Sequence, residues 1–291
     1  MDGCIGLDDF YFVSGDSGKI EFLQKAYDKL GGVDVLFHLA AINGTRWFHE
    51  RPDLVVRVNH DTTQAAIEFA GRYGCRIVYT SSPEAFGEQS EMPLREDSNS
   101  LFTPAHLHRR HSYGASKYIS ELLIQHAVHN DALDARIVRP FNAYGPRLPG
   151  GAYGQVVSIF LTACLHGRDI KLHGGGEQTR SFTYVDDIVE AIRLTGELDA
   201  GIDGSRMAGS TYNIGSAEEI SIADLANTCI AVSGAEISIV SAKGHPGDAL
   251  RRIPDQSTAI AALGWQPIVP LEQGLERCWS WIKSSLAEAS D

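Results

Sequence analysis

Short apolar runs alternate with amphipathic stretches along the first half of the chain. Residues 33–39 read Val-Asp-Val-Leu-Phe-His-Leu, an almost continuous apolar run that is typical of a parallel strand covered on both faces. The stretch 52–73 begins with Pro and is followed by Gly74, as helices often are. By the same criteria we predict strands at 10–14, 33–39, 76–80 and 135–139, and helices at 20–30, 52–73 and 112–129. This alternation predicts an α/β fold with a doubly wound parallel sheet.

After Pro146 the elements become shorter and a glycine-rich loop appears at 149–154. We predict helices at 155–166, from Val185, at 222–233 and at 271–284, and a strand at 211–214. We therefore expect a Rossmann-like sheet domain over residues 1–145, to which 184–215 return. A smaller substrate lobe would comprise 146–183 and 216–291, and a ligand would bind in the cleft between the two parts.

Composition narrows the choice of partners. The 291 residues carry a formal net charge of −12, which argues against a nucleic-acid surface because phosphate backbones require a basic face. A few local arginines can still hold a small diphosphate. The five cysteines are dispersed without metal-ligand spacing, which indicates reduced thiols. No signal peptide or membrane span is recognisable, so we expect a cytoplasmic protein.

The sharpest chemical pattern is Tyr113-Gly114-Ala115-Ser116-Lys117. Positions i and i+4 lie on one face of a helix, so the phenol of Tyr113 and the ammonium of Lys117 would point into the same space. A nearby ammonium lowers the pKa of a phenol, and such a phenol can take a proton from a sugar hydroxyl. Taken alone, the pattern fits a surface helix pair equally well.

The residues around this helix favour a catalytic role. The strand at 76–80 runs into Ser81-Ser82-Pro83-Glu84, and the strand at 135–139 runs into Pro140-Phe141-Asn142. A hydroxyl at the end of a strand, such as that of Ser82, is well placed to hydrogen-bond a reacting oxygen. Ser82 by itself would also fit ordinary turn chemistry.

Ordered motifs over nearly the whole chain resemble the extended short-chain dehydrogenases of the NAD-dependent epimerase/dehydratase family, which act on nucleotide sugars. They are VLFHLAA at 35–41, SS at 81–82 with Gly87, YGASK at 113–117, RPFNAYGPR at 139–147, GEQTRSFTYVDD at 176–187, YNIG at 212–215, RIPD at 252–255 and LGWQP at 263–267.

The resemblance implies specific roles. Tyr113 would be the catalytic base, Lys117 would tune it and hold the nicotinamide ribose, and Ser82 would share the proton. The remaining assignments are Glu84 near the sugar's C5, Asp16, Leu39, Ala40 and Ala41 around the NAD cofactor, and Asn142, Arg180 and Arg252 at the sugar diphosphate.

One departure concerns the start of the chain. Members of the family open with a strand, a glycine-rich turn and a helix that hold the pyrophosphate, whereas residues 12–16 match the family's third strand. We therefore expect one βαβ unit to be absent, either naturally or because the chain is trimmed. Strand 10–14 would then move inward to pair with 33–39, or a partner would cover the gap. A competing alignment treats Gly15 and Gly18 as a decayed glycine turn, with Glu21 at the third glycine position.

The favoured function is an NAD-dependent UDP-sugar epimerase that works as a homodimer, with no nucleic-acid, membrane or metal partner. Alternatives are a dehydratase or decarboxylase, a pseudoenzyme that binds nucleotide sugar without NAD, and a redox-free acid–base enzyme that uses Glu84. Pro83 at the usual dehydratase Asp position weakens the dehydratase alternative. His106, His108 and His111 form a basic loop without the carboxylate or Cys spacing of a metal site.

Overall fold

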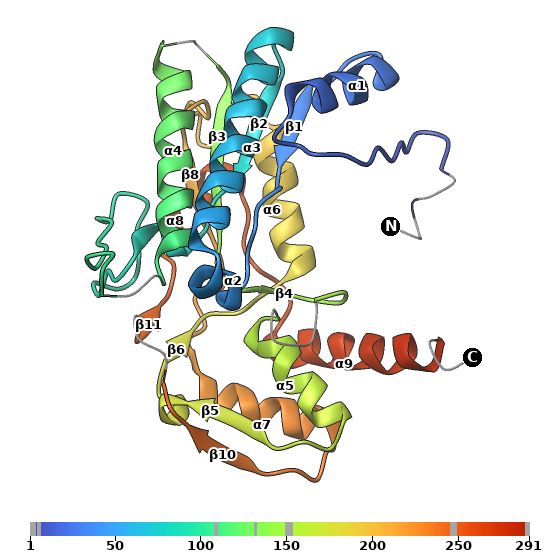
Figure 1. Ribbon diagram of the computed structural model, residues 1–291, viewed down its shortest axis with the longest axis vertical. Helices are drawn as coiled ribbons and strands as arrows, with labels where there is room; N and C mark the ends of the chain where they lie inside the picture. The colour runs from blue at the N-terminus through green and yellow to red at the C-terminus, as the bar shows by residue number, and fades with distance from the viewer. Residues whose placement is uncertain are drawn as a thin grey trace.

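The computed structural model describes residue 4 and residues 7–107, 110–130, 133–148, 154–244 and 249–288. The larger part is an α/β domain around a four-stranded parallel sheet in the order β1-β2-β3-β8 (Figure 1). Its strands are β1 (Val35–His38), β2 (Arg76–Thr80), β3 (Ala135–Pro140) and β8 (Thr211–Ile214). The expected doubly wound α/β class is confirmed.

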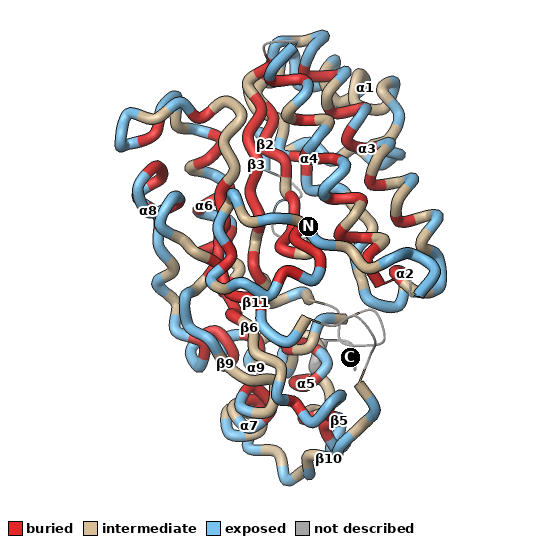
Figure 2. Tube along the Cα trace, turned by 90° about the vertical axis from the view of Figure 1, so that its left-hand side faces the viewer, coloured by how far each residue is buried: buried red, intermediate tan, exposed pale blue. Residues whose placement is uncertain are grey.

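Helices cover both faces of this sheet. One face carries α3 (Pro52–Tyr73) and α4 (Ser112–Asn130), and the other carries α6 (Val185–Glu197) and α8 (Ser257–Leu263), with β2 and β3 buried between them (Figure 2). The remaining helices of this part are α1 (Ile20–Leu30), α2 (Thr45–Glu50) and the short η1 (Pro83–Phe86). Gly74 ends α3 in a left-handed conformation with φ of 70°, which glycine adopts without strain.

A smaller lobe lies beyond the carboxyl ends of the strands (Figure 1). Its core is formed by buried side chains of α5 (Val156–Leu165), α7 (Ile222–Ser233) and α9 (Leu271–Glu288), against which the parallel pair β5 (Ile170–His173) and β10 (Ile239–Ala242) packs. Short segments connect the lobe to the sheet: β4 (Ala143–Tyr144), η2 (Gly174–Gly176), β6 (Thr179–Arg180), β7 (Thr183–Tyr184), β9 (Ile220–Ser221) and β11 (Arg251–Arg252). In contrast to the expected lobe boundary, α8 and Trp265 pack against the sheet core; the domain division itself stays a prediction.

The predicted strand at 10–14 is wrong, because these residues adopt no strand conformation. Nor do they pair with β1, whose outer edge has no strand partner anywhere in the described ranges. Phe37 of β1 is 40% exposed, unlike the residues of β2 and β3. The apolar pattern of 10–14 was real, but a strand also needs a neighbouring strand for its backbone hydrogen bonds.

Within the described ranges, no helix combines the length and the apolar character that crossing a bilayer requires. The cytoplasmic location stays a prediction. The glycine-rich loop at 149–154 lies outside the described residues apart from Gly154.

Candidate active site

Helix α4 brings Tyr113 and Lys117 together at the carboxyl end of β2. Both side chains are buried, and the Lys117 ammonium donates a hydrogen bond of 2.6 Å to the carbonyl of Thr80. Gly114 makes this approach possible, because a Cβ at that position would lie 2.2 Å from the carbonyl oxygen of Glu84. The first turn of α4 therefore lies directly against the loop that carries Ser82 and Glu84.

The electrostatics of the pair differ from the expectation that Lys117 lowers the pKa of Tyr113. Burial raises the pKa of Tyr113, a hydrogen bond with Ser82 lowers it, and the charge of Glu84 raises it further. Burial lowers the pKa of Lys117 to about 7, although the charge of Glu121 opposes that shift. Desolvation dominates both groups, since removing either charged form from water is unfavourable. Tyr113 is consequently a neutral phenol in this structure.

Ser82 caps the short helix η1 and faces Tyr113. Its hydroxyl accepts a hydrogen bond of 3.2 Å from the backbone N–H of Glu84 and also lies within hydrogen-bonding reach of the Tyr113 hydroxyl. The adjacent Ser81 instead donates to the buried carboxylate of Glu121, at 2.5 Å. Of the two serines, Ser82 is therefore the one beside the base.

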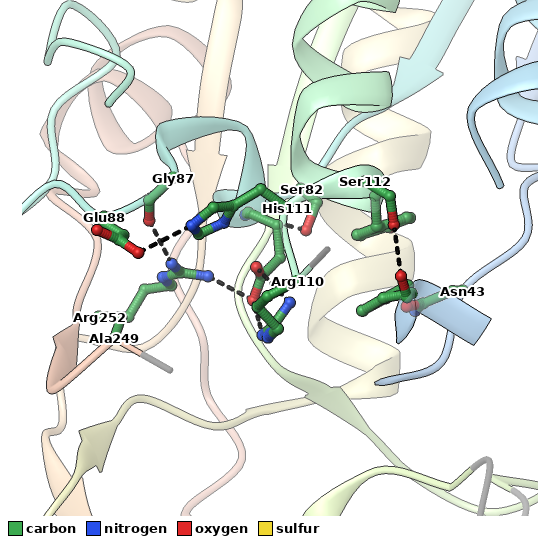
Figure 3. A network of polar contacts seen from close by, with 12 residues as sticks. Asn43, Ser82, Gly87, Glu88, Arg110, His111, Ser112, Ala249 and Arg252 are labelled. Carbon is green, nitrogen blue, oxygen red and sulfur yellow. Dashed lines mark hydrogen bonds and ion pairs between the residues drawn. The ribbon is translucent and has the colours of Figure 1, made fainter. Parts of the chain in front are cut away.

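Glu84 is bound by two arginines. Arg110 makes two hydrogen bonds of 3.0 Å to its carboxylate, and Arg252 approaches the same carboxylate at 2.5 Å. Arg252 also donates to the carbonyl of Gly87 at 2.7 Å (Figure 3). Burial raises the pKa of Glu84, but Arg252 and Arg110 outweigh it and hold the pKa at about 2. Glu84 is thus a permanently charged carboxylate with an excess of positive charge around it.

The predicted substrate residues make internal contacts. The amide of Asn142 donates to the carbonyl of Ser181 at 2.7 Å, and Arg180 donates to the carbonyls of Thr179 and Ala249. Arg180 is also near enough to lower the pKa of Glu84 by its charge. The structure therefore brings Arg180 and Arg252 to the same place, beside Glu84, and leaves their assignment to a diphosphate as a proposal.

NAD fits the described residues on its nicotinamide side. His38 of β1 lies opposite Tyr79 of β2, so the segment 39–41 that follows passes the end of β2, where Lys117 reaches Thr80. Leu39 and Ala40 are exposed there and Ala41 is half-buried, which leaves surface for a ring. Lys117, Tyr113 and this segment would hold the nicotinamide half.

The residues considered for the other half of the cofactor lie in and before the turn that leads into α1. Asp16 is exposed, and its carboxylate accepts a hydrogen bond of 2.9 Å from the backbone N–H of Gly18 in the turn before α1. A Cβ at Gly15 would lie 2.2 Å from the ring of Phe22, so this glycine serves local packing. Neither Gly15 nor Gly18 has a positive φ.

No group of three or more His, Cys, Asp or Glu side chains that could hold a metal ion occurs within the described ranges. His108 lies outside the described residues. His111 is buried and its Nε2 lies 3.0 Å from Glu88 (Figure 3), whereas His106 is exposed, so His111, unlike His106, faces inward.

Sequence reasoning missed Arg110 as an individual site residue, because the HRRH run appeared as one basic loop. It also missed His38 and Tyr79. His38 is buried, and its ring is tilted against that of Tyr79 with the two centroids 5.4 Å apart; the Tyr79 ring lies 4.8 Å from the Lys117 ammonium. The signal for these two was their position: each occupies the same level of adjacent parallel strands.

A parallel sheet with a Tyr/Lys helix and a Ser-bearing loop at the carboxyl ends of its strands defines a Rossmann-like scaffold. The chain belongs to the NAD dependent epimerase/dehydratase family, whose model matches residues 4–215. This confirms the family resemblance and places the chain in a family of enzymes.

Relatives in this family modify nucleotide sugars. The chain is 30% identical over 284 residues to UDP-glucuronic acid decarboxylase 1 of Xenopus tropicalis, covering 97% of this chain and 62% of the relative. It is 33% identical over 258 residues to UDP-N-acetyl-alpha-D-glucosaminuronate decarboxylase of Bacillus cytotoxicus, covering 86% of this chain and 77% of the relative.

Among solved structures, the UDP-glucuronic acid 4-epimerase of Bacillus cereus, in complex with UDP-glucuronic acid and NAD, superimposes with a TM-score of 0.85. The two sequences are 26% identical, and the match covers 98% of this chain and 85% of the epimerase.

Proposed function

We propose that this protein oxidises C4 of a UDP-sugar with NAD and returns the hydride to the opposite face, as a 4-epimerase does. The observation that carries the proposal is the convergence of Tyr113, Ser82 and Lys117 at one point beside the end of β2. The names of the relatives specify UDP-sugars, and we assign UDP as the nucleotide on that basis.

Each residue has a defined task in this mechanism. In its phenolate form, Tyr113 would take the proton of the C4 hydroxyl on Oη while the hydrogen on C4 leaves as a hydride, and Ser82 would hydrogen-bond the same oxygen. When bound, NAD would supply the hydride acceptor, and Lys117 with the segment 39–41 would hold its nicotinamide half. Lys117 would place its ammonium beside Tyr113, where a positive charge would offset the rise that burial causes in the pKa of Tyr113. Asn142, Arg180 and Arg252 would bind the diphosphate.

A second candidate is decarboxylation of a UDP-uronic acid, and the arginines around Glu84 favour it. A C4 ketone is β to a C6 carboxylate, so the C5–C6 bond can break with loss of CO2 once C4 is oxidised. Arg110 and Arg252 already bind one carboxylate at this point, and guanidinium groups suit that task. Both relatives quoted above by sequence are decarboxylases.

Product analysis distinguishes the two candidates. The protein would be incubated with NAD and either UDP-glucose or UDP-glucuronic acid, and the sugar products identified by NMR. A 4-epimer supports the first candidate and a pentose with released CO2 supports the second. Tyr113→Phe should lower turnover by about 10²-fold or more, whereas Tyr118→Phe, an exposed tyrosine on the same helix, should not.

Ligand binding tests the pseudoenzyme and redox-free alternatives. A ligand at 100 times its Kd adds about 2.7 kcal/mol to the free energy of unfolding, which a thermal-shift titration resolves. Stabilisation by NAD⁺ and by UDP supports hydride transfer. Stabilisation by UDP compounds alone would replace it with a binding or redox-free role.

We also propose that the protein is a homodimer through α3 and α4. Tyr118, Ile119 and Leu122 are exposed on α4, and a hollow beside them is lined by Val56 and His60 of α3. An apolar strip of this kind on paired helices suits a two-fold contact with a second copy.

A further inference from the structure

Lys117 is buried in surroundings that disfavour the charged form of its side chain. The side chain is 2% exposed, and within the described ranges its ammonium donates one hydrogen bond, to the carbonyl of Thr80. An ammonium can donate three hydrogen bonds, and burial without them disfavours the charged form. The proposed chemistry nevertheless requires a cation beside Tyr113.

The ring of Tyr79 faces this ammonium. Lys117 Nζ lies 4.8 Å from the centroid of the Tyr79 ring and 5.7 Å from that of Tyr113. Both distances fall within the range in which a ring quadrupole attracts a cation, and the attraction is greater in a desolvated site. Tyr79 is therefore the closer of two aromatic faces around the charge.

The hydroxyl of Tyr79 does not explain why a tyrosine is buried here. The side chain is 1% exposed, and its oxygen has no hydrogen-bond partner of good geometry in the described ranges, although Ser120 and Thr63 lie close to it. A buried hydroxyl without a partner is destabilising. The ring itself is thus the part of Tyr79 that makes a favourable contact.

The titratable groups around Lys117 differ in whether they favour its charged form. His38 of β1 faces it across Tyr79, and burial together with the charge of Lys117 lowers the pKa of His38 to about 4, so at neutral pH it adds no charge. Glu121 lies one turn along α4 and favours the ammonium, but its own charge is shared with Arg139 of β3 and with Ser81. Glu84 acts on the neighbouring Tyr113. Glu121 therefore stabilises the Lys117 ammonium only in part, and the aromatic faces supply further stabilisation.

We propose that Tyr79 is a positioning residue whose ring face holds the Lys117 ammonium, in its charged form, beside Tyr113. The catalytic part of this inference rests on the proposed function, whereas the contact between ring and ammonium does not. Weakening the quadrupole without changing the shape of the ring should then make Lys117 lose its proton at lower pH.

The test replaces Tyr79 with a graded series: Tyr79→Phe, Tyr79→difluorophenylalanine and Tyr79→trifluorophenylalanine. The titration of Lys117 is followed by NMR of protein with ¹³C-labelled lysine, with the signal assigned from Lys117→Met. Tyr79→Phe keeps the ring face and should leave the titration in place. The fluorinated rings should move it progressively to lower pH, by about one unit at trifluorophenylalanine.

Tyr212 provides the matched control, since it is also 1% exposed and its hydroxyl also lacks a partner in the described ranges, but it lies on β8. Fluorinated rings at 212 should not move the titration. An unchanged titration along the Tyr79 series, or an equal shift from Tyr212, would overturn the proposal.

The pH profile of turnover links this contact to catalysis. If UDP-sugar oxidation occurs, its alkaline limb should move to lower pH along the Tyr79 series, in step with the NMR titration; an alkaline limb that stays fixed would refute the catalytic part. If the unmodified protein oxidises no UDP-sugar, the proposed function fails, while the NMR titration still decides the role of the ring.

Discussion

At the scale of single residues, the site is dominated by charges that are held away from water. Glu84 lies between Arg110 and Arg252, and Lys117 lies between aromatic rings. The two guanidinium groups keep Glu84 ionised, whereas burial lowers the pKa of Lys117 to about 7. Substitutions here should therefore act on stability as well as on turnover.

Glu84→Gln should destabilise the protein, because the two guanidinium groups lose their shared counter-charge. We expect the free energy of unfolding to fall by about 2 kcal/mol or more. Glu68→Gln is the control: Glu68 pairs with Arg72 at the exposed surface of α3, where an ion pair contributes about 0.5 kcal/mol or less. Urea unfolding measures both, and equal losses would contradict the buried role of Glu84.

His38 should make stability depend on pH. Its pKa is lowered from 6.5 to about 4, so between these values the unfolded chain binds a proton that the native protein does not. The free energy of unfolding is then full above pH 6.5 and falls as the pH drops toward 4, by up to about 3 kcal/mol.

Replacing His38 with Gln should flatten this dependence when urea unfolding is repeated across the same pH range. The exposed His126 provides the control, since His126→Gln should leave the slope as it is. If the dependence of stability on pH persists in His38→Gln, groups other than His38 cause it.

At the scale of elements, the start of β3 is joined to the end of α6. Arg136 of β3 is 1% exposed, and its guanidinium donates to the carbonyls of Thr195 and Leu198 at 2.7 and 2.5 Å. It also binds the carboxylate of Asp134. The last carbonyls of a helix have no partner within the helix, so this arginine fixes where α6 lies on the sheet.

Arg136→Met should lower the free energy of unfolding by about 3 kcal/mol, because the carbonyls of Thr195 and Leu198 lose their donor, whereas Asp134 keeps Arg76. Arg193→Met, on the exposed face of α6 where Arg193 pairs with Glu190, should change it by about 0.5 kcal/mol or less. Thermal unfolding of the two variants provides the comparison. Similar losses would show that Arg136 has no special role at the end of α6.

Helices with recognisable capping residues at both ends were predictable from the sequence. The bounds of α3 and α7 match the expectation, because a proline or a serine cap begins each helix and a glycine in left-handed conformation ends it. Residues 10–14 were not predictable, since their apolar pattern does not reveal whether a neighbouring strand is present.

The candidate site was predictable where its residues share an element, as Tyr113 and Lys117 do. Arg110 could not be assigned from spacing, because its partner Glu84 lies 26 positions away. The raised pKa of Tyr113 was also out of reach, since burial depends on the loop and strands that enclose the helix rather than on the helix itself.

At the scale of the whole molecule, the exposed strip on α4 is the surface that we assign to a second copy. Leu122→Glu, at a residue 53% exposed on that helix, should convert a dimer into a folded monomer because it places a charge in an apolar contact. Ile260→Glu, at an exposed position on α8, should leave the dimer intact. Sedimentation velocity reports the mass of each. A monomeric unsubstituted protein would reject the assignment.

The helix α1 has a different consequence for the molecule. None of its residues is buried, and its Tyr27 ring stacks at 3.9 Å on Tyr73 of α3. Detaching this helix exposes only the part-buried side chains that pack against the core, Ile20, Leu23 and Tyr27, so this part opens at a free energy well below that of global unfolding. Amide hydrogens of α1 should exchange first, and a protease should cut there while the sheet remains folded. The lifetime of the chain in a cell would then depend more on how often α1 detaches than on the free energy of global unfolding.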